Sequence, residues 1–306
     1  QERPGILEEL LLMVAQDCNM RCAYCYAQGG SYGKKRNLMK RKTAFHAINT
    51  ALSLGNIKSI SFFGGEPFLN FPLIKEVVEQ YGNQFKYSLV TNGTIMNNSV
   101  IEFIRTNNIS ITVSIDGPEI IHDLNRTYVN GKGSHSTVTK ALNKLKDGGI
   151  PFALEATFSR QAIDVGYTAR KILEYLYTFS PSIKITPVGI TDNPVFRLSS
   201  KELIEYFIQC FDFAYEKMIK SDPINLFDVT ALISKISSEN RIVPRVMCPA
   251  ISRRLTVFPD GDVYPCYLIN DQELRYGNIF DSHFEKRFIE KNTILFNSLD
   301  REYLIN

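Results

Sequence analysis

The sequence predicts an α/β fold in which six β-strands alternate with five helices over about the first 190 residues. Three observations support this prediction: short apolar runs of strand length recur, segments with helical spacing separate them, and turn residues such as Gly148 and Gly149 punctuate the pattern. The strands are almost continuously apolar, as is typical of a parallel sheet covered on both faces. Six such units form either an open doubly wound sheet or a partial (β/α) barrel, and in both folds ligands bind at the carboxyl ends of the strands.

The elements can be placed in order along the chain from these patterns. The six strands are expected at Leu10–Ala15, Ser59–Phe63, Tyr87–Thr91, Ser110–Ile115, Phe152–Phe158 and Ile183–Val188. Helices are expected at 43–54, 72–81, 97–106, 134–147, 164–178, 199–220, 226–238 and 283–298. Thr43 and Ser134 are predicted N-caps, because a hydroxyl there can accept from the free amides of the first turn. Pro259-Asp260-Gly261 predicts a hairpin between strands Arg254–Phe258 and Asp262–Tyr264.

The composition is that of an ordinary globular protein, with 44% hydrophobic and 22% charged residues. A net charge of +3 is too small to indicate a nucleic acid or an acidic membrane as a partner. No apolar run approaches the length of a membrane span, so we expect no membrane segment. A cytoplasmic location is expected from the chemistry of the clustered cysteines described below. Because the chain begins at Gln1 instead of Met, we expect a native N-terminal segment to precede it.

Three of the six cysteines, Cys18, Cys22 and Cys25, fall within eight residues directly after the first strand. Such clustering favours metal ligation in a reducing compartment over disulfides. Cysteine thiolates hold iron–sulfur clusters, and three ligands to a cluster of four irons leave one iron open for a bound molecule. A structural zinc site is the alternative interpretation, although no fourth Cys or His lies nearby; His46 is 21 residues beyond the last of the three.

The segment Cys18-x3-Cys22-x-Tyr24-Cys25 resembles the signature of radical S-adenosylmethionine (SAM) enzymes. The resemblance spans about residues 8–190 and implies a partial (β/α)6 TIM-like barrel, in agreement with the six strands. It implies a [4Fe–4S] cluster on the three cysteines, with SAM bound at the open iron. Reductive cleavage of SAM then yields a 5′-deoxyadenosyl radical that removes a hydrogen atom from a substrate. The implied electron donor is flavodoxin- or ferredoxin-like, and no protein side chain is expected to be catalytic beyond the cluster and cofactor.

Short motifs after the later strands match the SAM-binding motifs of this family. Gly64-Gly65-Glu66-Pro67 corresponds to the motif whose backbone meets the amino group of the methionine part, although an isolated Gly-Gly also reads as a tight turn. Arg126 is suited to a bidentate contact with the methionine carboxylate. The complete set of implied cofactor-binding residues is Tyr24, Gly64, Gly65, Glu66, Pro67, Thr91, Asn92, Ser114, Asp116, Arg126 and Thr157.

A second cysteine pair, Cys248 and Cys266, flanks the predicted hairpin with the spacing Cys-x12-Gly-x4-Cys. This spacing resembles the opening of the SPASM/twitch auxiliary-cluster domain of peptide-modifying radical SAM enzymes, and it implies that both cysteines bind an additional iron–sulfur cluster. The full pattern continues with further cysteines, and none follows Cys266 here. Two buried structural thiols are the alternative. Cys210, on the apolar face of a predicted helix, is interpreted as a core residue.

These resemblances imply three regions: a radical SAM barrel at 1–190, a helical connector at 191–240 and a SPASM/twitch-like region at 241–306, possessing fewer cysteines than the full pattern. The expected function is modification of a ribosomally made peptide, with formation of a thioether crosslink from a peptide cysteine. An anaerobic sulfatase-maturing enzyme, which oxidises Cys or Ser to formylglycine in a protein substrate, is the second interpretation. A non-catalytic zinc or iron–sulfur protein is the third, but a structural metal would not need the glycine-rich and Ser-Ile-Asp-Gly motifs.

Overall fold

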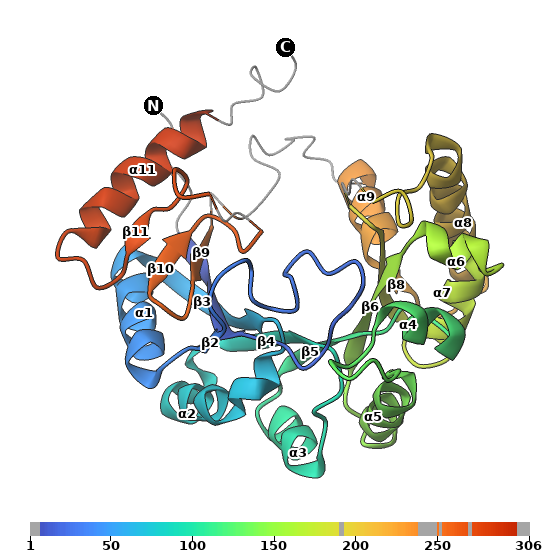
Figure 1. The fold of residues 1–306 in the computed structure, drawn as a ribbon, viewed down its shortest axis with the longest axis horizontal. Helices are drawn as coiled ribbons and strands as arrows, with labels where there is room; N and C mark the ends of the chain where they lie inside the picture. The colour runs from blue at the N-terminus through green and yellow to red at the C-terminus, as the bar shows by residue number, and fades with distance from the viewer. Residues whose placement is uncertain (1–6, 190–192, 238–249, 251–252, 269–270, 299–306) are drawn as a thin grey trace.

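Six parallel strands form the centre of a curved sheet, as the sequence predicts (Figure 1). The computed structural model describes residues 7–189, 193–237, 250, 253–268 and 271–298. The six strands are β1 Leu7–Gln16, β3 Gly55–Gly64, β4 Lys86–Thr91, β5 Ser110–Ser114, β6 Phe152–Phe158 and β7 Ser182–Pro187. Each pairs in parallel with the next, which confirms the partial (β/α)6 barrel.

Helices cover the convex side of this sheet (Figure 1). In the barrel they are α1 Arg41–Leu54, α2 Phe71–Tyr81, α3 Asn98–Thr106, α4 Glu119–Asn125, α5 His135–Asp147, α6 Arg160–Asp164 and α7 Ala169–Tyr177, with 3-10 turns η1 Pro67–Asn70 and η2 Gly82–Gln84. The helices α4 and α6 were not expected, because seven and five residues are too few to show a helical period. The other five lie within the predicted ranges or within two residues of them.

The two predicted N-caps behave differently from the expectation. The prediction for Thr43 is wrong: Lys40 occupies the N-cap position of α1 without a side-chain capping hydrogen bond, and Thr43 lies buried inside the helix. Ser134 does occupy the N-cap of α5, but its hydroxyl makes no capping hydrogen bond. Asp123 replaces it, accepting from the backbone amides of Ser134 and His135 at 2.7 and 2.8 Å. A side chain from another helix thus satisfies these amides, and the Ser134 hydroxyl is available elsewhere.

The C-terminal region extends the same sheet. The hairpin strands β9 Arg254–Val257 and β10 Asp262–Tyr264 pair antiparallel, as predicted, and β9 pairs in parallel with β1. The short strands β8 Asn225–Leu226 and β11 Gly277–Asn278 end the order β11-β10-β9-β1-β3-β4-β5-β6-β7-β8 in the described part of the chain. The short strand β2 Asn37–Leu38 lies off this path and pairs antiparallel with β1. The other named helices among the described residues are α8 Ser200–Ile219, α9 Phe227–Ser237 and α11 Phe284–Ser298.

The strands bury one face against the helices and keep the other partly accessible. In β6, Phe152, Leu154 and Phe158 are buried under the helices, whereas Glu155 and Thr157, which alternate with them, are only half-buried. Full burial of a large apolar side chain contributes about 1.5–3 kcal/mol. This outward face therefore holds the fold together and leaves the concave face available for ligands. No helix among the described residues is long and apolar enough to cross a membrane.

Candidate cofactor site at the carboxyl ends of the strands

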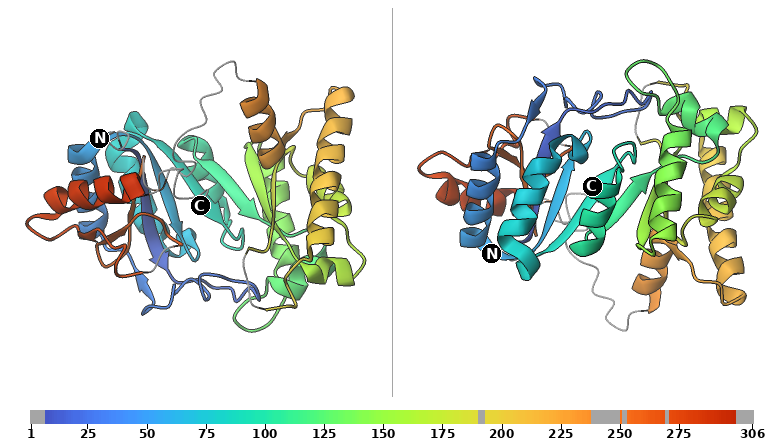
Figure 2. Two further views of the ribbon diagram at one scale, coloured as in Figure 1. Left: turned by 90° about the horizontal axis from the view of Figure 1, so that it is seen from above. Right: turned by 90° about the horizontal axis from the view of Figure 1, so that it is seen from below.

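The three clustered cysteines lie on a long connection between β1 and β2, residues 17–36, which we call the cysteine loop. It crosses the concave side of the sheet in Figure 1, and the side views place it at one end of the strands (Figure 2). Its backbone pairs with the segment after α4: Arg21 N donates to Thr127 O at 2.8 Å, and Ala23 N donates to Asn125 O at 2.9 Å. The loop is thereby held as one side of a short ribbon.

The cysteines of the loop are half-buried, and their thiols are close enough to influence one another. Burial raises the pKa of Cys18 to about 12, and the negative charges of Glu66 and Cys22 act in the same direction. Burial also raises the pKa of Cys22, with a further contribution from Cys25. Asn92 Nδ2 lies 3.7 Å from the Cys18 sulfur and can donate to it. Thiols in such a place become thiolates when a metal supplies the compensating charge.

The number of ligands distinguishes zinc from an iron–sulfur cluster. A structural zinc needs four ligands within about 2.3 Å of a single ion. Among the described residues, no group of three or more His, Cys, Asp or Glu side chains is placed to hold one metal ion. An iron–sulfur cluster is bound by cysteine thiolates, and three thiols are the number that leaves one of four irons open.

The glycine pair after β3 is required by its close approach to β1. A Cβ atom on Gly64 would lie 2.1 Å from Ala15 O, and one on Gly65 would lie 2.2 Å from Asp17 O. Gly65 N donates to Ala15 O at 2.8 Å, and Glu66 N donates to Asp17 O at 2.9 Å. The pair therefore presses the end of β3 onto the start of the cysteine loop. Its contact with the methionine part of SAM stays a prediction.

Glu66 lies behind this surface and organises it. It is 0% exposed, and burial raises the pKa of its carboxyl to about 7. One carboxylate oxygen accepts from Phe68 N at 3.1 Å and Thr91 Oγ1 at 2.8 Å, and the other accepts from Asn92 N at 2.7 Å. Asn92 in turn contacts Cys18. Glu66 and the buried Pro67 thus support the site from inside, and a direct contact of either with SAM stays a prediction.

Tyr24, Asp116 and Arg126 meet at the tyrosine hydroxyl. The Tyr24 hydroxyl donates to Asp116 Oδ2, and Arg126 Nη1 donates to the hydroxyl oxygen at 2.9 Å. Arg126 Nη1 also lies 3.6 Å from Asp116 Oδ1. Burial raises the pKa of Asp116, and the guanidinium opposes that shift. The Arg126 side chain therefore already has partners within the protein. The sequence instead predicts it to be free for the carboxylate of the cofactor.

The same cluster retains unused hydrogen-bonding capacity. Arg126 Nε and Asn125 Oδ1 are buried and have no partner in the structure. A buried donor without a partner costs about 1–3 kcal/mol, so such atoms indicate a missing ligand or water. A carboxylate would satisfy the guanidinium. This observation fits a cofactor with an amino-acid headgroup at this position.

Ser114 and Thr157 end neighbouring strands on the same side. Ser114 is 9% exposed, and Thr157 N donates to Asp116 Oδ1 at 3.0 Å. Next to them, Lys184 Nζ pairs with Glu155 Oε1 at 2.7 Å on the concave face, with 44% and 30% of the two side chains exposed. The sequence reasoning missed this pair, and only the strand alternation of β6 and β7 could have indicated it.

The hairpin of the C-terminal region contacts the cysteine loop. The Tyr267 ring packs on Phe63 with 4.3 Å between centroids, and it lies 6.3 Å from the Tyr26 ring. Lys34 of the loop pairs with Asp260 and Asp262, both at 3.7 Å. Cys25 packs against the same small apolar cluster, which consists of Leu11, Met13, Ala27, Tyr32, Phe258 and Tyr264. Sequence reasoning did not identify these aromatic residues, because their proximity exists only in the folded chain.

The predicted auxiliary pair is described only in part. Cys266 is half-buried directly before Tyr267, whereas Cys248 lies outside the described residues. No described cysteine forms a disulfide. Cys210 is buried in the main core on α8, which confirms its interpretation as a core residue.

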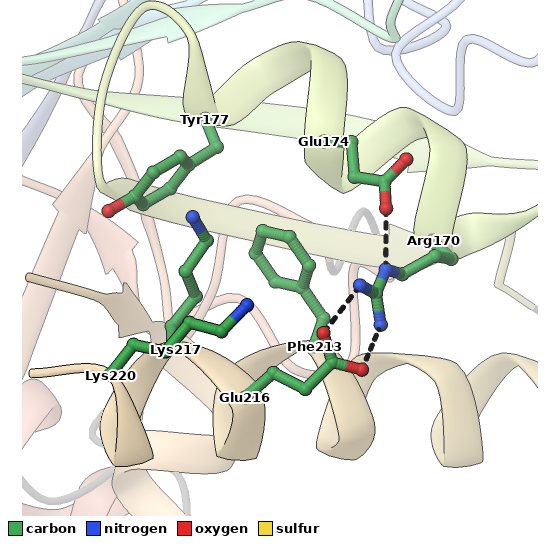
Figure 3. A pocket seen from close by; sticks show the side chains of 7 residues that line it. All are labelled: Arg170, Glu174, Tyr177, Phe213, Glu216, Lys217 and Lys220. Carbon is green, nitrogen blue, oxygen red and sulfur yellow. Dashed lines mark hydrogen bonds and ion pairs between the residues drawn. The ribbon is translucent and has the colours of Figure 1, made fainter. Parts of the chain in front are cut away.

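Two hollows elsewhere in the described residues do not coincide with the strand ends. One of about 150 Å³ lies between α7 and α8 (Figure 3), and its Arg170 is fully engaged by Glu174 and, in a bidentate pair, by Glu216. Lys217 lies over the Tyr177 ring at 3.7 Å. The other, of about 400 Å³, is an apolar groove between α8, α9 and β7. Neither carries a cysteine-loop residue, so we do not assign the cofactor to them.

A partial α/β barrel with three thiols on the loop after its first strand, and a hairpin packed over that loop, defines an iron–sulfur protein of the SAM-binding class. Comparison with known families agrees. Residues 12–159 match the Radical SAM superfamily and residues 248–300 match SPASM, an iron–sulfur cluster-binding domain. The chain belongs to the radical SAM proteins that carry a SPASM domain. Its cofactors are accordingly a [4Fe–4S] cluster, SAM and auxiliary iron–sulfur clusters.

Several known proteins are similar to this chain. It is 27% identical to a cysteine-type anaerobic sulfatase-maturating enzyme of Clostridium perfringens, over 92% of the chain and 80% of that protein. It is 25% identical to the radical SAM cyclopropyl synthase TigE of Paramaledivibacter caminithermalis, over 85% of the chain but 57% of that protein. It is 36% identical over 178 residues to an uncharacterized protein of Methanocaldococcus jannaschii, and the aligned region covers 56% of this chain and 59% of that protein.

Solved structures share the fold. The structure of native anSMEcpe with bound AdoMet and the Cp18Cys peptide has a TM-score of 0.79 and 23% identity, over 95% of this chain and 82% of that chain. At this level of identity the similarity establishes the fold alone. It shows that the barrel and the C-terminal extension of this chain are arranged as in a protein that holds both a SAM molecule and a peptide.

Proposed function

We propose that this radical SAM protein modifies a peptide or protein substrate that enters the concave side of the barrel. The observation that carries the proposal is the accessible polar face beside the cysteine loop, where Glu155 and Lys184 are paired yet partly exposed. A complete TIM barrel fills its interior with packed side chains, whereas this sheet is open between β8 and β11 in the described residues. An open, polar interior suits an extended chain with backbone amides.

The residues of the site divide into three roles in this proposal. Cys18, Cys22 and Cys25 hold the [4Fe–4S] cluster, which with SAM supplies the radical chemistry of the reaction. Arg126 binds the carboxylate of the SAM methionine part, and the glycine motif with Asn92, Ser114 and Thr157 lines the remainder. Cys248 and Cys266 contribute to the auxiliary cluster.

The protein's own contribution is orientation and exclusion of water. The Tyr24 hydroxyl fixes the guanidinium of Arg126 at 2.9 Å, so that the guanidinium meets a carboxylate without reorganisation. The ring of Tyr267 on Phe63 shields the side of the cysteine loop that faces the hairpin. Shielding of this kind strengthens electrostatic contacts within the site and protects reactive species from water.

The reaction that we propose is formation of a thioether crosslink from a peptide cysteine. Its support is the similarity to AlbA, an antilisterial bacteriocin subtilosin biosynthesis protein of Bacillus subtilis, which is 23% identical over 89% of the chain. Formylglycine formation is the second candidate. A specific observation favours it: the sulfatase-maturating enzyme is similar over 92% of the chain. We further propose a flavodoxin- or ferredoxin-like donor and a cytoplasmic setting low in oxygen.

An anaerobic assay with the reconstituted protein tests the first level of the proposal. Iron, sulfide, a reductant and SAM are supplied, and 5′-deoxyadenosine is quantified. We expect its formation, and a fully reconstituted protein that forms none would contradict the proposal. A protein that only stores iron or zinc would give this negative result.

Mass spectrometry of peptides encoded beside the gene tests the substrate. A thioether crosslink removes two hydrogens and leaves one cysteine thiol resistant to alkylation. Formylglycine instead exchanges the sulfur and two hydrogens of a cysteine for one oxygen and creates an aldehyde that reacts with hydrazides. Formation of 5′-deoxyadenosine without either change in any candidate peptide would contradict the peptide substrate while leaving the family assignment intact.

A further inference from the structure

A buried histidine stands behind the cofactor site, and none of the roles described above uses it. His122 lies on α4 and is 0% exposed, yet both of its ring nitrogens are hydrogen bonded. Asp116 N donates to Nδ1 at 3.3 Å, and Nε2 lies 2.8 Å from Ser134 Oγ. Because Nδ1 accepts a hydrogen bond, the neutral ring carries its proton on Nε2 and donates it to Ser134.

The chain of hydrogen bonds continues to Arg126. The Ser134 hydroxyl donates to Arg126 O at 2.7 Å. His122 therefore connects the backbone of Asp116 to the backbone of Arg126. The side chains of these same two residues meet at the Tyr24 hydroxyl, so that a closed circuit runs through both backbones and both side chains. A closed circuit of largely buried polar groups specifies one geometry, since a shift of any member leaves a polar group unpaired.

This circuit also determines where the cysteine loop lies. Asn125 O and Thr127 O, on either side of Arg126, accept from the loop amides of Ala23 and Arg21 at 2.9 and 2.8 Å. These are the backbone positions next to Cys22. A displacement of the Arg126 backbone would therefore displace the acceptors that hold the loop.

We propose that His122 is a positioning residue for the cofactor site: in its Nε2–H tautomer it sets the separation of Asp116 and Arg126, and through them the position of Tyr24 and of the cysteine loop. It touches neither the cofactor nor the reacting atoms. The proposal rests on the membership of the chain in the radical SAM family and does not depend on the identity of the substrate.

Two substitutions separate the two hydrogen bonds of the ring. His122→Asn keeps an acceptor near the position of Nδ1 but loses the link to Ser134, and His122→Gln keeps a donor near Nε2 but loses the acceptor for Asp116. His135→Gln is the matched control. Its ring centroid lies 5.6 Å from that of His122, but its Nε2 contacts Tyr175 Oη at 2.8 Å and no residue of the site.

Two measurements on the full chain decide the proposal. Hydrogen exchange at the amides of Arg21 and Ala23 is followed in the metal-free protein, and the KM for SAM in 5′-deoxyadenosine formation is measured after reconstitution, with iron quantified. Loss of one buried hydrogen bond corresponds to about a tenfold effect. We expect about tenfold lower protection and about tenfold higher KM in both His122 variants at unchanged iron content, and no change in His135→Gln.

Wild-type protection and KM in both His122 variants would overturn the proposal, as would equal losses in the His135 control. Should a His122 variant fail to fold, Ser134→Ala interrupts the same circuit at the next atom and is expected to give the same two changes. The exchange measurement needs neither metal nor substrate. A chain that cleaves no SAM, or modifies no peptide, would therefore contradict the proposed function without affecting this test.

Discussion

Replacement of Glu66 by glutamine isolates the buried carboxylate that organises the site. Glu66→Gln preserves shape but converts one acceptor oxygen into a donor NH2 group. The two oxygens accept from Phe68 N, Thr91 Oγ1 and Asn92 N, so the better orientation of the amide sacrifices the contact with Asn92 and places two donors face to face. A hydrogen bond to a charged group contributes about 1.5–3 kcal/mol, and a buried unpaired donor costs about 1–3 kcal/mol. Burial outweighs these hydrogen bonds: it raises the pKa of the carboxyl from 4.5 to about 7, so this group lowers the stability of the wild-type protein by about 1.4 kcal/mol per pH unit as the pH rises from 5 to 7. We expect Glu66→Gln, which carries no charge, to remove this fall.

The assay is urea denaturation of the metal-free protein at pH 5, 6 and 7. The folded protein keeps the Glu66 proton over most of this range, whereas the unfolded chain releases it near pH 4.5. Glu79→Gln is the control, because Glu79 is exposed on α2 and pairs only with Lys75 at 3.6 Å; it should cost less than about 0.5 kcal/mol. If Glu66→Gln shows the same fall in stability with pH as the wild type and this control, Glu66 does not keep its proton in the folded protein and the reasoning is refuted.

The remaining predictions concern acid, backbone and metal. Burial lowers the pKa of His122 to about 2. The unfolded chain therefore binds a proton at this histidine below pH 6.5, whereas the folded chain does not. The contribution of His122 to the free energy of unfolding is constant above pH 6.5 and falls by about 1.4 kcal/mol per pH unit below it. His122→Asn should flatten this slope in urea midpoints between pH 6.5 and 5.5, and an unchanged slope would contradict a neutral buried ring. Gly64→Ala places a methyl group 2.1 Å from the Ala15 carbonyl oxygen at a φ of +144°, and it should lower the free energy of unfolding by about 3 kcal/mol or more. Gly189→Ala is the control, because its methyl group would have nothing within 4 Å, and it should cost less than about 1 kcal/mol. Thermal denaturation measures both. Cys22→Ala should abolish 5′-deoxyadenosine formation and lower the iron content, while Cys210→Ala should lose about 1 kcal/mol of stability and keep activity; the reverse result would refute the assignment of cluster ligands.

Much of the barrel could be predicted because its signals are local. Each central strand is a short segment rich in apolar and β-branched residues, and each major helix has its own apolar stripe, so both could be recognised without knowing their partners. The elements that escaped prediction are the short ones. The helix α4 has seven residues, and β2, β8 and β11 have two each, which is too few for a period to register. Ser134 was placed at the right helix end, but its hydroxyl is used by Arg126 and the capping is done by Asp123.

The chemical character of the site also followed from local spacing, whereas its internal contacts did not. Three cysteines in eight residues indicate a metal cluster in any fold that keeps them together. That Arg126 would be engaged by Tyr24 could not be predicted, because the two residues are 102 positions apart. The same is true of Lys34 and Tyr264, which lie 230 positions apart.

The sequence by itself determined the order of strands and helices, the parallel sheet and the cluster-binding character of the loop after β1, since hydrophobic period and ligand spacing act over a few residues. Only the tertiary structure decided that β9 pairs with β1 and that Phe258 of the hairpin packs on Tyr32 of the cysteine loop. It also decided that His122 closes a circuit between Asp116 and Arg126. These contacts arise when distant segments exclude water together. Their partners are selected by the packing of the whole barrel, and no short stretch of the sequence records that selection.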